Sequence, residues 1–86
     1  MSINTDSHLG HYLAAEIRAE IARQEMTIAS LAEKARMNRK TLGQSLRGTR
    51  TLNTLEVEQV AHALGVTGSE LYALAESRRE SGRAVA

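Results

Sequence analysis

Helix boundary signals recur at short intervals along this chain, and they restrict its fold more than any other feature of the sequence. Residues that can cap a helix, by accepting hydrogen bonds from its first free N–H groups, stand at Thr27, Asn38, Asn53 and Thr67. Between these positions apolar residues recur every three or four residues, and no alternating strand pattern is present. The chain lacks proline and is rich in residues that favour helix. The sequence therefore predicts an all-α domain of short helices.

Five helices are expected. Their predicted bounds are 8–24, 28–35, 39–46 and 54–64, followed by a short helix that begins after Thr67. Gly48 and Gly65 stand where the third and fourth helices should end, because glycine adopts the left-handed conformation without a Cβ clash. The periodicity is lost after residue 76. We therefore expect a flexible N-terminus over 1–7, one folded domain over 8–76 and a disordered tail over 77–86.

Positive charge is concentrated in one segment of a chain whose net charge is only +1. Residues 34–50 include six basic residues and no acidic one, whereas the rest of the chain has five basic and ten acidic residues. A basic run is often only a solvated face. Here the run coincides with a short predicted helix between two turns, and such a local concentration is what a phosphate-binding surface needs.

The predicted third helix has two different faces. At about 100° per residue, Leu42 and Leu46 lie on one side and are suited to a core. The other side carries Arg39, Lys40, Gln44 and Arg47, with Gly43 among them. Arg and Lys can donate to guanine, and Gln can pair with the adenine edge, in a major groove. A glycine inside a helix costs about 1 kcal/mol relative to alanine, so Gly43 either weakens this helix or allows close approach to bases.

The residues also carry a resemblance to a known family. The segment TIASLAEKARMNRKTLGQSLRGTR, followed by LEVEQVAHALGVTGSELYAL, resembles the helix-turn-helix domain of the phage repressor and Cro family. The match covers about residues 13–75. Its most specific elements are Leu31-Ala32, Leu42, Gly48 and AHALGV at the end of the fourth predicted helix. The resemblance implies a lambda-repressor-like fold of five helices that binds double-stranded DNA.

The resemblance also implies roles for individual residues. Helix 28–35 would lie across the DNA backbone, and helix 39–46 would enter the major groove. The positions implied to contact bases are Arg39, Lys40 and Gln44, with Gly43 beside them. The positions implied to meet phosphates are Thr27, Asn38, Arg47, Thr49 and Arg50, and we add the turn residue Arg36.

The sequence departs from the family pattern at several positions. Ile28 replaces a glutamine that usually contacts a phosphate, so that contact is expected to be lost. Arg36 stands where the turn often has a glycine with positive φ, which suggests a turn of different shape. Ile21 and Leu46 replace an Arg–Glu pair of the family, and we expect them to form an apolar core contact instead.

We interpret the chain as a transcriptional regulator that represses by occupying an operator. A single recognition helix contacts few base pairs, so we expect a homodimer on a palindromic operator. Candidate dimer residues are Val66, Leu71, Tyr72 and Leu74, and burial of these side chains within the monomer is the equal alternative. Two other functions remain open: an antitoxin that also binds a toxin, and an interaction module that has lost DNA binding.

Other classes of protein find little support in the sequence. No nucleophile–base arrangement, phosphate loop or carboxylate pair indicates an enzyme, and we expect no cofactor. There is no cysteine, and His8 and His11 are too few ligands for a metal site. No apolar run suits a membrane span and no signal peptide is seen. We expect a cytoplasmic protein of a bacterium or a phage-infected cell, associated with the nucleoid.

Overall fold

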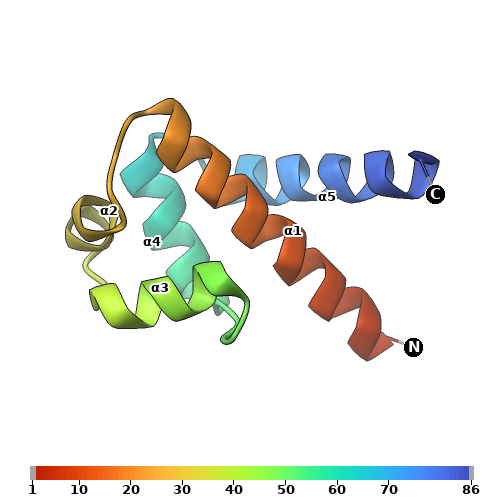
Figure 1. Cartoon of the computed structure of the whole chain (residues 1–86), viewed down its shortest axis with the longest axis horizontal. Coiled ribbons are helices and arrows are strands. Elements are labelled where there is room, and N and C mark those ends of the chain that lie inside the picture. The colour runs from red at the N-terminus through yellow and green to blue at the C-terminus, as the bar shows by residue number, and fades with distance from the viewer. Residues whose placement is uncertain (1, 86) are drawn as a thin grey trace.

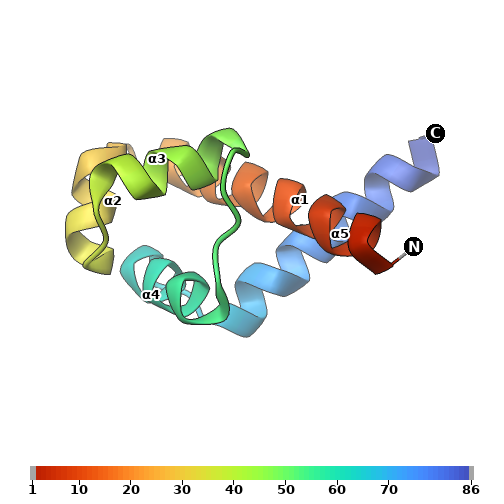
Figure 2. The same cartoon turned by 90° about the horizontal axis from the view of Figure 1, so that it is seen from below.

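The computed structural model describes residues 2–85 and, within them, the side chains of residues 9–81. This part of the chain contains helices and no strand, which confirms the all-α prediction. The helices are α1 (Ser2–Arg23), α2 (Ile28–Ala35), α3 (Arg39–Arg47), α4 (Thr54–Leu64) and α5 (Gly68–Val85). In Figure 1, α2, α3 and α4 form one end of the molecule, and α1 and α5 extend from it toward the other end. Figure 2 shows the same arrangement from below.

One apolar core joins the five helices. Its largest fully buried side chains are Ile17, Leu31, Leu42, Leu71, Val57 and Val60. Each helix contributes at least one of them, because each has an apolar stripe at helical spacing. Leu46 belongs to this core and Ile21 is partly buried against it, while the direct contact between the two stays a prediction.

The N-termini of α2, α3, α4 and α5 are capped by the residues that the sequence predicts. The Thr27 hydroxyl oxygen accepts a hydrogen bond from the Ser30 backbone N–H, and the Asn38 side-chain oxygen accepts two, from Lys40 and Thr41. Reciprocal capping boxes stand at the start of α4 and α5, formed by Asn53 with Glu56 and by Thr67 with Glu70. These caps fix where the helices begin.

Four helices end in a left-handed residue, and the same pair of backbone hydrogen bonds closes each end. After α3 and α4 that residue is Gly48 (φ 88°) and Gly65 (φ 85°), as predicted. After α1 and α2 it is Glu25 (φ 54°) and Arg36 (φ 58°), which have a Cβ. The turn at Arg36 therefore keeps the conformation that a glycine would favour. The expectation of a different turn shape is wrong.

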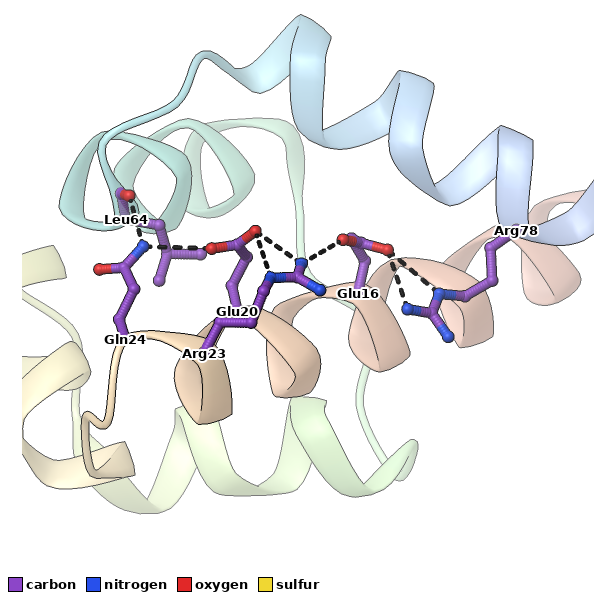
Figure 3. Close-up of polar contacts among 6 residues, drawn as sticks. All are labelled: Glu16, Glu20, Arg23, Gln24, Leu64 and Arg78. Atoms are coloured by element: carbon purple, nitrogen blue, oxygen red, sulfur yellow. Dashed lines mark hydrogen bonds and ion pairs between the residues drawn. The ribbon is translucent and has the colours of Figure 1, made fainter.

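A buried carboxylate links α1 to α5. Glu16 is 5% exposed, and its oxygens accept hydrogen bonds from Arg23 (2.9 Å) and Arg78 (3.1 Å). Figure 3 shows this row of polar contacts along α1. At its end the Gln24 side chain donates to the Leu64 carbonyl oxygen (2.9 Å) and so satisfies a free carbonyl at the C-terminus of α4.

The structure differs from the sequence prediction at both ends of the domain. α1 begins at Ser2 and so includes residues 2–7, expected to be flexible. α5 continues to Val85, through most of the segment 77–86, expected to be disordered. The ion pair of Arg78 with Glu16 holds the second half of α5 against α1, and no apolar periodicity predicts such a contact. Residues 1 and 86 and the side chain of His8 lie outside the described part of the chain. No helix within residues 2–85 is both long and apolar enough to cross a bilayer.

Candidate nucleic-acid interface

The outer face of α3 is a row of exposed basic side chains. Leu42 and Leu46 are buried at 0% and 2% exposure, and they fix the rotation of α3 about its axis. Arg39, Lys40 and Arg47 then lie on the exposed side, as the helical projection predicts. Since the buried leucines anchor the helix, these three cations are presented on a rigid element.

A shallow groove separates this face of α3 from the start of α2. The α3 side of the groove consists of Arg39, Lys40, Gly43 and Arg47. The α2 side consists of Thr27, Ile28 and Ala29. Sequence reasoning treated Ile28 only as a lost contact and did not consider Ala29. The signal that could have placed both in the site is their position directly after the cap of α2.

Gly43 is the smallest residue that lines this groove. It is buried, and a Cβ at this position would lie 3.3 Å from the Arg47 Nη1 atom. The guanidinium group of Arg47 therefore lies over Gly43. A side chain at residue 43 would thus contact the end of Arg47, which is a local packing reason for glycine besides the two given by the sequence.

Basic side chains within residues 34–47 differ from those elsewhere in whether they have a partner in the protein. Outside residues 34–47, every arginine with a described side chain has a partner within the protein. The partners are carboxylates for Arg23, Arg50, Arg78 and Arg79, and the Leu46 carbonyl oxygen for Arg18. Within 34–47, no ion pair or side-chain hydrogen bond to described residues is made by Lys34, Arg36, Arg39, Lys40 or Arg47. The unpaired cations are thus confined to α2, the turn and α3.

The remaining predicted contacts occupy different places. Thr27 and Asn38 are exposed at the N-termini of α2 and α3, where backbone N–H groups favour an anion. Gln44 is half-buried and does not line the groove, and Arg36 is exposed on the turn, also outside it. Of the predicted base-contacting residues, the groove therefore brings together Arg39, Lys40 and Gly43. Gln44 lies outside it, one helical turn after Lys40.

Two predicted phosphate contacts have other roles in the structure. Arg50 donates to both carboxylate oxygens of Glu56 (3.0 and 2.7 Å) and to the Ser45 hydroxyl (3.0 Å). The Thr49 hydroxyl donates to the Gln44 carbonyl oxygen (3.1 Å) and closes the end of α3. Three of the five N–H donors of Arg50 and the Thr49 hydroxyl are thus engaged within the protein. We propose a structural role for both residues, and their phosphate contacts stay predictions. The sequence alone does not indicate that Arg50 would form an ion pair with Glu56, six residues later.

Arg47 and Arg50 provide a direct test of this division. We expect Arg47→Ala to weaken binding to all duplexes alike, to lower the slope of log affinity against log salt by about one, and to leave the melting temperature unchanged. Arg50→Ala should instead lower the melting temperature and leave the affinity for duplexes and its salt dependence unchanged. It removes the link between the loop after α3 and the start of α4. Thermal unfolding and duplex titrations of both variants check this. Loss of affinity at unchanged melting temperature for Arg50→Ala would instead support the predicted phosphate contact of Arg50.

Two carboxylates should make stability depend on acidic pH. The Arg50 guanidinium lowers the pKa of Glu56 below its ordinary value of 4.5, and Arg23, with Gln24, lowers the pKa of Glu20. A carboxylate with a lowered folded-state pKa contributes stability above pH 4.5, and this contribution is lost as pH falls through the folded pKa. Urea unfolding from pH 7 to pH 3 should show the loss. Glu56→Gln should be less stable at pH 7 and lose less on acidification; an unchanged pH profile in this variant would contradict the assignment.

Comparison with known proteins agrees with this geometry. Residues 11–74 match the model of the family described as winged helix-turn-helix DNA-binding. The chain belongs to the winged helix-turn-helix DNA-binding family. The match spans all of α2, α3 and α4, so the free basic face of α3 lies within the family's domain. No strand occurs within residues 2–85, so this part of the chain has no β-wing. The family match confirms the helix-turn-helix resemblance. The narrower resemblance to phage repressors and Cro stays a prediction.

Solved structures share the fold of this family member. The clp gene regulator ClgR from Corynebacterium glutamicum superposes with a TM-score of 0.80 at 26% identity, over 88% of this chain and 81% of ClgR. A second ClgR structure gives 0.73 at 27% identity, over 81% and 91% of the two chains. A point mutant of the restriction-modification controller protein C.Esp1396I gives 0.75 at 20% identity, over 81% and 89%. None of the curated protein sequences matches the chain.

Proposed function

We propose that this protein is a sequence-specific double-stranded DNA-binding regulator of transcription that represses by occupying an operator. The observation that carries the proposal is the set of unpaired cations on α3, in a protein whose described arginines outside residues 34–47 are all paired. An unpaired, exposed basic face on a rigid helix attracts a polyanion and releases counterions when DNA binds. The similarity to ClgR, named as a clp gene regulator, supports a regulatory role.

The proposed binding mode follows from the geometry of α3. Its N-terminal half would enter the major groove, where Arg39 and Lys40 can donate to guanine O6 and N7. Gln44, one turn later, can pair with the edge of adenine. Thr27 and Asn38 at the two helix N-termini, with Arg47 and Arg36, would contact phosphates and set the register of the protein on the duplex.

A homodimer on a palindromic operator would give this short recognition helix enough base contacts. Two copies would place their α3 helices in successive major grooves about 34 Å apart. Leu74 on α5 is 41% exposed, and Tyr72 and Val66 are half-buried, so these three residues form the proposed contact between copies. Leu71 is removed from this set because it is 0% exposed and belongs to the core.

Selection of bound duplexes from a random pool tests the proposal. We expect enrichment of one palindromic sequence whose half-sites are one helical turn apart. A titration of the enriched duplex should weaken steeply between about 50 and 200 mM salt, because several phosphates are neutralised. A pool that stays unenriched, with no binding even at low salt, would overturn the proposal and favour an interaction module.

The antitoxin alternative makes a different prediction. An antitoxin would bind its own operator and also a toxin, so a second protein would co-purify with the chain from its native host. The same selection experiment applies to both, and only the co-purifying toxin separates them.

A further inference from the structure

Ile28 is the one large apolar side chain among the described residues that line the groove. Three large apolar side chains among the described residues are exposed: Ile28 (39%), Leu55 (65%) and Leu74 (41%). Of these, only Ile28 lines the groove that also contains Arg39, Lys40 and Arg47. This exposed isoleucine lies beside three unpaired cations, where a bound duplex would contact it.

We propose that Ile28 packs against the 5-methyl group of a thymine and thereby selects this base at one position of each half-site. The inference rests on the proposed function and adds a residue that determines specificity. It also predicts the composition of the operator, since the selected half-site must contain a thymine that the protein recognises through its methyl group.

The chemistry of DNA leaves few partners for such a side chain. An isoleucine offers no donor, so covering a phosphate oxygen with it would remove water from the oxygen without replacing the hydrogen bond. The base edges exposed in a major groove are polar except for the thymine methyl group, which side chains contact through apolar packing. Removal of apolar surface from water would then stabilise the complex.

The local structure holds Ile28 in one place. It is the first residue of α2, directly after the cap at Thr27. Thr27 and Ser30 exchange hydrogen bonds of 3.0 and 3.1 Å, which fix the backbone on either side of Ile28. A β-branched side chain is also restricted at χ1 by its two heavy atoms on Cβ, so its methyl groups have few orientations. An apolar side chain held in one place can contact the methyl group of only one base position, and so can favour thymine there.

Deoxyuridine provides the test, because it pairs like thymidine and lacks only the 5-methyl group. Each thymine of the selected half-site is replaced in turn, symmetrically in both half-sites, and the affinity of the full-length protein is measured. We expect one position at which the replacement weakens binding about fourfold per half-site, as the burial of one methyl group predicts. The other thymines should tolerate the replacement.

Substitutions then assign this methyl contact to Ile28. Ile28→Ala should weaken binding to the thymine duplex by a similar factor and should no longer distinguish thymine from deoxyuridine at that position. Ile28→Val, which keeps the branched carbon, should retain most of the discrimination. Leu55→Ala is the matched control, because Leu55 is exposed on α4 outside the groove, and it should leave the discrimination unchanged. Melting temperatures of all variants confirm that they are folded.

The outcomes separate this inference from the proposed function. If the protein selects an operator but no deoxyuridine replacement weakens binding, or if Ile28→Ala keeps the discrimination, the thymine contact does not exist. A loss with Ile28→Ala that is equal on all sequences would assign Ile28 to the sugar-phosphate backbone and would equally overturn it. Failure to select any operator would instead reject the proposed function itself.

Discussion

Replacing Lys40 with alanine is expected to lower the affinity for the preferred operator about 5- to 150-fold per half-site. Lys40 is exposed in the first turn of α3, lines the groove and has no partner among the described residues. One good contact to a base edge contributes about 1–3 kcal/mol of discrimination. Its loss should also relax specificity at one base pair, so a second duplex selection with the variant should show one position that is no longer enriched.

Lys34 provides a control of the same residue type for this experiment. It is exposed in the last turn of α2, it is also unpaired within the described structure, and it lies outside the groove. Lys34→Ala changes the net charge of the protein by the same amount as Lys40→Ala. A change in long-range attraction alone would affect the two variants equally. Equal losses would therefore argue that α3 contributes only charge and does not contact base edges.

The fold could be predicted from the sequence because its signals are local. The caps at Thr27, Asn38, Asn53 and Thr67 depend on a side chain and the backbone two or three residues later. Gly48 and Gly65 end helices for an equally local reason. Arg36 shows the limit of this reasoning. It adopts positive φ although it has a Cβ, because backbone hydrogen bonds from Arg36 to Glu33 and from Met37 to Ala32 close the turn.

The candidate site could be predicted only in part. The buried leucines of α3 fix its exposed face, so Arg39, Lys40 and Arg47 follow from periodicity. Which arginines are already paired does not follow, because a pair such as Arg50 with Glu56 depends on how the loop after α3 folds back onto α4. For the same reason the tail could not be predicted: Arg78 meets Glu16 across a sequence separation of 62 residues. Long-range polar contacts leave no periodic trace in a single sequence.

Replacing Leu71 with alanine should cause the largest loss of stability among the variants considered. Leu71 is completely buried where α5 joins the core, and a Leu→Ala change at such a site costs about 2–5 kcal/mol through lost burial and the cavity left behind. For a domain of this size each kcal/mol lowers the melting temperature by about 4–8 °C. Urea and thermal unfolding at several protein concentrations should show a loss that does not depend on concentration.

Leu74→Ala is the control that separates the core from the proposed contact between copies. Leu74 lies on the same helix, three residues later, but is 41% exposed, so its truncation should cost the monomer far less. If α5 forms the dimer contact, this variant should dimerise more weakly in sedimentation experiments while its monomer remains folded. The two leucines would then act in different equilibria, Leu71 in folding and Leu74 in association. A Leu71→Ala protein that is as stable as wild type, with only its dimerisation impaired, would contradict the placement of Leu71 in the core.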